Sequence, residues 1–219
     1  MKVFEKRREE EVEVKVGPCL LKGILRLPAS MGGMVLFAHG SGSGRFSPRN
    51  TFVARVFQDS GMGSLLIDLL EEQEAEDRRN VFDIDLLADR LLAVTKWLAQ
   101  EPLTMGVSIG YFGASTGAGA ALQAAARAPA AVSAVVSRGG RPDLAAPYLA
   151  RVMAPTLLIV GGLDSQVIEL NREAYAQLTC PKQLAIVPGA THLFEEPGTL
   201  EQVTNLALDW FHRYLPNAD

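Results

Sequence analysis

The sequence predicts an α/β fold in which helices cover both faces of one open, mostly parallel sheet. Three observations predict it: short apolar runs without alternation, amphipathic helical segments between them, and an alternating charged segment near the N-terminus. Apolar runs without alternation are typical of strands that are buried on both faces. These runs occupy residues 34–38, 64–68, 107–112, 131–136, 156–160 and 183–187.

The N-terminal segment predicts an antiparallel hairpin. In "EVEVKV" (11–16), three valines alternate with charged residues, which is the period-2 pattern of a half-buried strand. Gly17-Pro18 is a turn signal, and "CLLKGILRLP" (19–28) follows as the partner strand.

Helical periodicity is clearest in two segments. "DIDLLADRLLAVTKWLAQ" (83–100) repeats leucine at helical spacing, and 199–215 gathers its apolar residues on one stripe. The stripe consists of Leu200, Val203, Leu206, Ala207, Trp210, Phe211 and Tyr214. Because the chain contains no internal repeat and no compositional break, we expect residues 1–219 to form one domain.

Composition excludes several classes of function. The net charge of −4 and the pI of about 5.5 offer no basic surface for nucleic acid. Cys19 and Cys180 are far apart, and with three histidines they match no metal spacing, so we expect buried free thiols, no metal and no cofactor. The N-terminus lacks the apolar region of a signal peptide, and no apolar run approaches the ~20 residues of a membrane helix. These features predict a cytoplasmic protein without membrane contact.

Ser115 is the candidate nucleophile. "VSIGYF" (107–112) reads as a strand, Gly113-Ala114-Ser115-Thr116-Gly117 as a turn, and "AGAALQAAARA" (118–128) as a helix that ends before Pro129. This order is the context of a G-x-S-x-G nucleophile elbow. The alternative is a helix start that is rich in small residues and contains a serine by chance.

A serine nucleophile needs a base, and the base needs a carboxylate that orients it. His192 follows the last parallel strand, whereas His212 lies opposite the apolar stripe of its helix and is expected to face solvent. His39 precedes Gly40 and is expected to brace a loop. Asp164 lies three residues past its strand, although it could instead cap the next helix. The predicted triad is therefore Ser115, Asp164 and His192, in the chain order of α/β-hydrolases.

Two backbone amides are predicted to stabilise the oxyanion. One is the N–H of Thr116, and the other is that of Ser41 in "HGSGSGR" (39–45), with Gly42 as the second choice. A phosphate-binding loop is the alternative interpretation of these glycines. However, no Lys-Ser/Thr follows them, and their spacing is not G-x-G-x-x-G.

The motifs "FAHGSGS", "GASTGAG", "LLIVGGLD" and "PGATHLF" resemble those of the dienelactone hydrolase-like group of α/β-hydrolases, from about residue 20 to the C-terminus. The resemblance implies the α/β-hydrolase fold and a Ser-Asp-His hydrolase that cleaves esters or lactones without a cofactor. Dienelactone hydrolases proper use cysteine as the nucleophile. Ser115 therefore points to a serine carboxylesterase of the same shape.

Compared with larger relatives, the connection between the sixth strand and the Asp-bearing strand has room for one short helix. We therefore expect an open cleft and no large cap domain. Four loop arginines, Arg45, Arg49, Arg138 and Arg141, lie at the same sheet edge. Guanidinium groups bind carboxylates, so Arg138 and Arg49 are candidates for binding an anionic substrate. Alternatively, the arginines pair with nearby acids, for example in the charged segment 71–80, which we expect to be a solvated loop.

Three functions remain at this point. The first is a serine esterase, with a thioesterase or acyltransferase as a variant that uses the same triad. The second is a binding or scaffold protein that keeps the fold without catalysis. The third is a nucleotide-binding domain that uses "GASTGAG", but this stretch comes late in the βα order and no acidic ribose partner follows about 20 residues on. The acyl and alcohol groups and the oligomeric state are not determined by these patterns.

Overall fold

The computed structural model describes residues 2–215. An eight-stranded sheet forms its centre, in the order β10-β9-β8-β7-β5-β6-β3-β2. The antiparallel pairs are β2 with β3 and β3 with β6, and the other neighbours in the sheet are parallel. Its strands are β2 (Arg8–Val16), β3 (Cys19–Leu27), β5 (Gly33–Ala38), β6 (Met62–Ile67), β7 (Ile109–Ala114), β8 (Ala134–Arg138), β9 (Thr156–Gly161) and β10 (Lys182–Val187). Two short strands, β1 (Lys2–Val3) and β4 (Ser30–Met31), pair with each other outside it.

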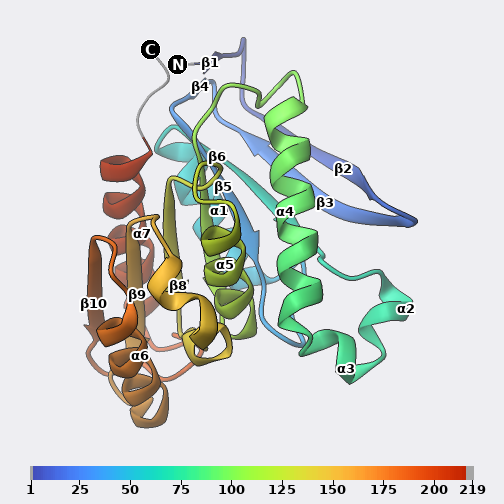
Figure 1. Cartoon of the computed structure of the whole chain (residues 1–219). Coiled ribbons are helices and arrows are strands. Elements are labelled where there is room, and N and C mark those ends of the chain that lie inside the picture. The colour runs from blue at the N-terminus through green and yellow to red at the C-terminus, as the bar shows by residue number, and fades with distance from the viewer. Residues whose placement is uncertain (1, 216–219) are drawn as a thin grey trace.

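Helices cover both faces of the sheet (Figure 1). On one face, α4 (Ile84–Gln100), α5 (Thr116–Arg127), the 3₁₀ segment η1 (Pro142–Arg151) and α6 (Ser165–Gln177) pack over one apolar core cluster. On the other face, α1 (Pro48–Asp59) and α7 (Thr199–Tyr214) cover a second cluster that contains Phe37, Phe57 and Phe112. No helix in residues 2–215 is long and apolar enough to span a membrane.

The strands predicted from apolar runs are confirmed, with boundaries that shift by up to three residues. The hairpin and the helices at 83–100 and 199–215 are confirmed as well. β10 is the exception in burial, because it is an edge strand and most of its residues are only partly buried or exposed. Among the described strands it pairs with β9 alone, but Leu184 packs against one core cluster and Ala185 against the other, to which Val187 belongs, and this accounts for its apolar run. α1 was not predicted, although Ser47 caps it and Pro48 begins it, a recognised start signal.

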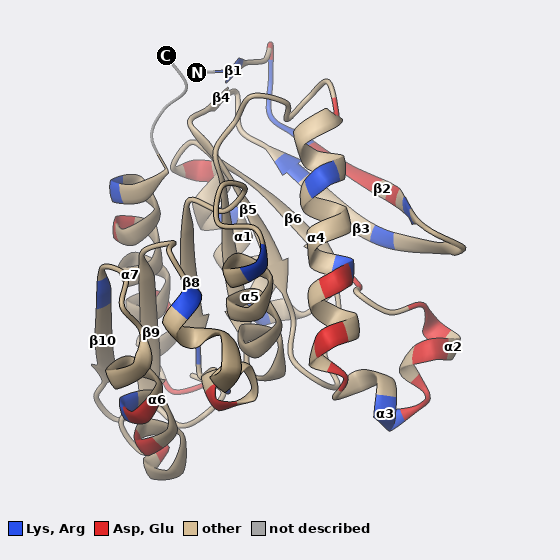
Figure 2. Ribbon diagram, viewed as in Figure 1, with Lys and Arg blue, Asp and Glu red and all other residues tan. Residues whose placement is uncertain are grey.

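The charged segment 71–80 is mostly exposed, as the sequence predicted, but it forms helical turns and not a loop. It contains α2 (Glu72–Ala75) and most of α3 (Arg78–Val81), two single turns on which Figure 2 colours the acidic residues red and the basic residues blue. Glu71 and Glu74 form a reciprocal capping box at α2, and the Asp77 carboxylate accepts a hydrogen bond from the Arg79 N–H at α3. These local bonds give the segment a defined shape beside the carboxyl edge of the sheet.

Candidate active site

Ser115 lies at the carboxyl end of β7, between the strand and α5. Its backbone has φ 50° and ψ −122°, a left-handed conformation that a residue with a side chain rarely adopts. Such a conformation costs about 1–3 kcal/mol and is found mainly at functional positions. The Ser115 side chain makes no capping hydrogen bond to α5. The helix start therefore does not account for the serine, and the elbow leaves its hydroxyl free for other contacts.

The two glycines of the motif are required by packing. A Cβ at Gly117 would lie 2.2 Å from the carbonyl oxygen of Ala38, and a Cβ at Gly113 would lie 2.5 Å from the Cα of Ala118. Both contacts are with backbone, which cannot move aside cheaply. The turn can therefore be this tight only with glycine on each side of Ser115.

Asp164 and His192 meet at the same edge, from loops that follow β9 and β10. The Nδ1–H of His192 donates a hydrogen bond of 2.7 Å to Oδ2 of Asp164. The Asp164 carboxylate makes no capping hydrogen bond, so the alternative helix-cap role is not the one it plays here. The Asp164 side chain is 16% exposed and the imidazole 39%, which leaves the far side of the ring open to a substrate. The pairing leaves Nε2 as the nitrogen that can accept a proton.

His192 lies next to the backbone that supports Ser115. A Cβ at Gly139 would be 3.6 Å from Cε1 of His192, and the preceding residue, Arg138, accepts a hydrogen bond of 3.3 Å from the Ser115 N–H. Within residues 2–215, no hydrogen bond of the Ser115 hydroxyl is formed with the imidazole. Catalytic hydrogen bonds are often long in unliganded enzymes and shorten only when substrate binds.

The two predicted oxyanion donors also lie together, but one of them has a partner. The Ser41 N–H donates 3.1 Å to Oγ1 of Thr116, so an incoming oxyanion must share or replace that acceptor. Thr116 is the first residue of α5, where the backbone N–H has no intrahelical acceptor. The Thr116 hydroxyl is consequently a feature of the site that the sequence pattern did not reveal.

Asp68 was also missed, because the apolar run 64–68 placed it inside the predicted strand, whereas in the structure it directly follows β6. Its carboxylate accepts 2.6 Å from the Arg45 N–H and pairs with the Arg45 guanidinium. His39 donates 3.0 Å from Nδ1 to the Gly40 carbonyl, and its Nε2 lies 3.8 Å from Oδ1 of Asp68. His39 therefore braces the loop 39–47, as predicted. His212 is exposed, as predicted, and lies far from this edge, near Ser60.

Three of the four loop arginines pair with acids, although not with those of 71–80. Besides Arg45 with Asp68, Arg49 pairs with Glu195 at 2.7 Å and Arg141 with Asp143 at 2.7 Å. Arg138 differs, because its side chain is buried beside the Phe112 ring and its Nη1 has no hydrogen-bond partner within residues 2–215. Burial, followed by the neighbouring Arg49 charge, lowers the pKa of Arg138 to about 10.

One group of side chains has metal-ligand character, and a cation already occupies it. Ligand atoms of Cys19, Glu71 and Glu74 lie within 4.8 Å of one another. The Arg90 guanidinium donates 3.1 Å to Sγ of Cys19 and 2.8 Å to Glu74. Burial alone would raise the pKa of Glu74, but the Glu71 N–H and Arg90 hold it below its ordinary value. The guanidinium thus bonds to Cys19 and Glu74, whereas Glu71 accepts a hydrogen bond from the Leu20 N–H. Cys19 and Cys180 are free buried thiols, as predicted.

The family of the chain follows from comparison with known proteins. The model of the dienelactone hydrolase family matches residues 57–215, which include Ser115, Asp164 and His192. The chain belongs to the dienelactone hydrolase family. A solved dienelactone hydrolase from Anabaena variabilis ATCC 29413 is 55% identical and superposes with a TM-score of 0.94 over 96% of this chain and 100% of that one. The expected α/β-hydrolase fold is confirmed.

More distant and longer relatives extend the comparison. Est1E from Butyrivibrio proteoclasticus shares the fold at 15% identity, with a TM-score of 0.79 over 93% of this chain and 98% of its own. Proteins from two strains of Mycobacterium tuberculosis, provisionally named phosphoribosyl transferases, are 59% identical over 208 residues. That match covers 95% of this chain and 47% of each relative, so the chain spans about half their length.

Proposed function

We propose that this member of the hydrolase family is a serine carboxylesterase that cleaves small ester or lactone substrates. Ser115 is the nucleophile, His192 the general base and acid, and Asp164 the carboxylate that orients the imidazole. The observation that carries the proposal is the 2.7 Å bond between Asp164 and His192 beside a strained Ser115 elbow. No cofactor is required for this chemistry.

The proposed reaction has two halves. Oγ of Ser115 attacks the substrate carbonyl while Nε2 of His192 takes its proton, and the Thr116 and Ser41 N–H groups stabilise the resulting oxyanion. His192 then returns the proton to the alcohol as the ester C–O bond breaks, leaving an acyl-enzyme. Water attacks the acyl carbonyl with His192 as base, which releases the acid and restores Ser115. The Asp164 charge stabilises the imidazolium in both halves.

Thioester cleavage and acyl transfer use the same intermediate and differ in the leaving group or the acceptor. The provisional name of the mycobacterial relatives belongs to chains about twice this length. The proposal for this chain rests on its own site. A scaffold without catalysis would not need a serine held at φ 50° with its hydroxyl uncommitted to helix capping.

Fluorophosphonate labelling and ester hydrolysis test the proposal together. We expect one adduct at Ser115 and hydrolysis of p-nitrophenyl acetate by the wild type, with both lost in Ser115→Ala. Ser165→Ala, at an exposed serine that begins α6, serves as the matched control and retains both. Folded wild-type protein that is neither labelled nor active would contradict the esterase function.

We further propose that Arg138, with Arg49, binds an anionic group on the alcohol side of the substrate. Arg49 is tied to the His192 loop through Glu195, and Gly139 joins Arg138 to the same loop. Two guanidinium groups close together in a buried setting repel each other, and a carboxylate would relieve that repulsion. Nη1 of Arg138 is buried and has no hydrogen-bond partner within residues 2–215, so a carboxylate that reaches it would supply the missing acceptor.

Matched acetate esters test this second proposal. 4-Acetoxybenzoate carries a carboxylate on its alcohol side, and 4-acetoxybenzamide is its neutral counterpart. Arg138→Ala should lower kcat/KM for the acid at least tenfold more than for the amide, and Arg138→Lys should recover part of the difference. Equal losses on both substrates would assign Arg138 a structural role instead.

A further inference from the structure

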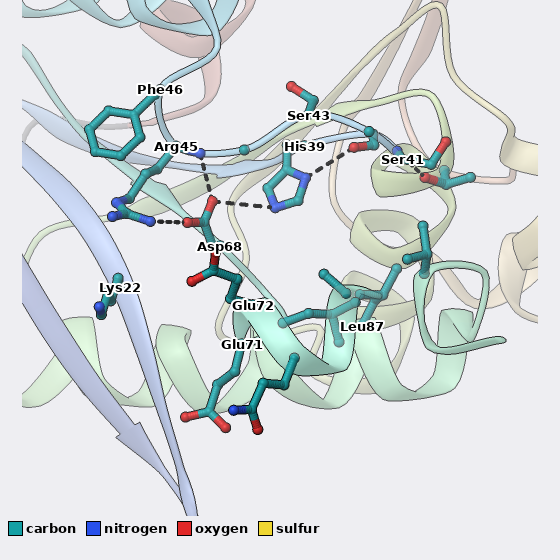
Figure 3. A pocket seen from close by; sticks show the side chains of 18 of the residues that line it. Lys22, His39, Ser41, Ser43, Arg45, Phe46, Asp68, Glu71, Glu72 and Leu87 are labelled. Carbon is teal, nitrogen blue, oxygen red and sulfur yellow. Dashed lines mark hydrogen bonds and ion pairs between the residues drawn. The ribbon is translucent and has the colours of Figure 1, made fainter. Parts of the chain in front are cut away.

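A cavity of about 750 Å³ opens beside the elbow, on the oxyanion side. Gly40, Ser41 and Thr116 line its inner end, and Gly40 packs so closely that a Cβ there would lie 2.9 Å from Cβ of Ser115. α2, α3 and the start of β3 form the outer walls. Figure 3 shows Ser41 and His39 toward one end of this cavity and Lys22, Arg45 and Phe46 toward the other.

The position of the cavity indicates which side of the ester, the acyl group or the alcohol group, would enter it. In the tetrahedral intermediate, the carbonyl carbon bears Oγ of Ser115, the oxyanion, the acyl group and the leaving oxygen. The leaving oxygen must face His192, which protonates it. The cavity begins at Thr116, and neither Ser115 nor any residue of the loops at 161–164 and 188–198, His192 included, lines it. The group that extends into it past Ser41 and Thr116 is therefore the acyl group.

We propose that this cavity is the acyl-binding pocket of the enzyme and that it takes a medium-length acyl group with a polar far end. The inference rests on the proposed esterase function and adds a substrate class to it. Alcohols of many sizes would be accepted, because their side of the site is the more open one around His192.

The lining supports this chemistry along its length. Leu70, Val81 and Leu87 supply apolar wall beyond the elbow. The charges of Asp68 and Arg45 neutralise each other, and Glu71 accepts a hydrogen bond of 2.9 Å from the Leu20 N–H. Lys22 and Glu72 also line the cavity, and in the described part of the chain neither forms an ion pair. Hydrogen-bonding groups at the end of an acyl chain would meet these two side chains.

Two isomeric esters give a direct test of the direction in which the substrate binds. Ethyl hexanoate and hexyl acetate share one formula and differ in which side of the ester is long. Each buried methylene multiplies kcat/KM by roughly four, so we expect at least a tenfold preference for ethyl hexanoate. A 6-hydroxyhexanoate ester should be accepted at least as well as the hexanoate. Equal rates for the two isomers, or a preference for hexyl acetate, would overturn the assignment.

A pair of adjacent substitutions locates the effect. Ala75 lines the cavity and Glu76 does not, and both are exposed, so Ala75→Trp fills the pocket and Glu76→Trp is its matched control. Ala75→Trp should lower kcat/KM for ethyl hexanoate about tenfold more than kcat/KM for ethyl acetate, while Glu76→Trp changes neither. A loss on hexyl acetate alone would place the alcohol in the cavity. If the wild type cleaves no ester at all, including p-nitrophenyl acetate, the proposed function fails first.

Discussion

The two sides of the candidate site differ in how completely they are assembled. On the His192 side, the imidazole already donates 2.7 Å to Asp164. On the Ser41 side, the N–H proposed to bind the oxyanion donates to the Thr116 hydroxyl instead. The Asp164–His192 pair is therefore formed before substrate arrives, although within residues 2–215 the Ser115 hydroxyl is not bonded to the imidazole. The oxyanion side must exchange one acceptor for another, and the loop 39–47 determines how well it does so.

Close backbone packing holds the loop that carries His192 in place. A Cβ at Gly161 would lie 2.4 Å from the Thr191 carbonyl oxygen, so the end of β9 and the His192 loop touch through backbone.

The start of the loop 39–47 is close-packed as well, because a Cβ at Gly117 would lie 2.5 Å from the His39 carbonyl oxygen. Farther along, the Asp68 carboxylate holds this loop by accepting a hydrogen bond from the Arg45 N–H and pairing with the Arg45 guanidinium. Substitutions on the first side should therefore act on proton transfer, and those on the second side on oxyanion stabilisation.

The largest expected effect comes from Asp164→Asn. An amide at this position can donate to Nδ1 and so favour the wrong tautomer of His192, which should lower kcat by about 10³–10⁴. The fold should persist, because the Asp164 side chain does not cap α6. Ester hydrolysis measures the loss, and Asp143→Asn, which alters the ion pair with Arg141, is the control. A wild-type rate of ester hydrolysis in Asp164→Asn would contradict the proposed role of the Asp164–His192 pair in catalysis.

An intermediate effect on kcat is expected from Asp68→Ala. This substitution removes the bonds between Asp68 and Arg45 that hold the loop 39–47, and it leaves the Asp164–His192 pair intact. Removing one oxyanion donor costs about 10²–10³ in kcat in a measured enzyme, and a displaced donor should cost less, about 10–10². We expect kcat to fall while KM for p-nitrophenyl acetate changes little. Binding of a trifluoromethyl ketone, which forms a tetrahedral adduct, should weaken in parallel. An unchanged kcat would show that the loop does not depend on Asp68.

Much of this molecule could be predicted from patterns that are local in sequence. Apolar runs in the sequence predict the buried parallel strands, and the strand–turn–helix pattern around Ser115 predicts the elbow. The capping box of Glu71 and Glu74 was also present as a local signal, but the density of charge in 71–80 suggested solvation instead. In the structure, the helical turns α2 and α3 form part of the wall of the neighbouring cavity.

Other features depend on contacts between distant residues. The bond between Ser41 and Thr116 joins positions 75 residues apart and depends on a side-chain rotamer. The sequence favoured Arg138 and Arg49 among the four loop arginines, yet in the structure Arg49 pairs with an acid as the other two do, and burial separates Arg138 from all three. Side-chain burial and pairing are set by the packed loops together, so no local pattern distinguishes these residues.

The smallest effect is expected from Glu196→Gln, which tests whether the His192 side is as firmly held as its hydrogen bonds suggest. The Glu196 carboxylate accepts 2.6 Å from the Thr191 hydroxyl and 3.1 Å from the Thr191 N–H, and the hydroxyl contact is the main cause of its lowered pKa. A carboxyl with a lowered folded-state pKa stabilises the fold above its unfolded pKa, and this contribution is lost as the pH falls through the lowered value. Wild type should therefore melt slightly above Glu196→Gln at pH 7, with the difference disappearing on acidification below about pH 4. The kcat at pH 7 should fall no more than severalfold, because exposed carboxylates contribute little.

Thermal melts at several pH values measure the difference in Tm between the wild type and Glu196→Gln. Glu173→Gln, at an exposed position of α6, is the control. A difference in Tm that does not depend on pH would contradict the predicted contribution of Glu196.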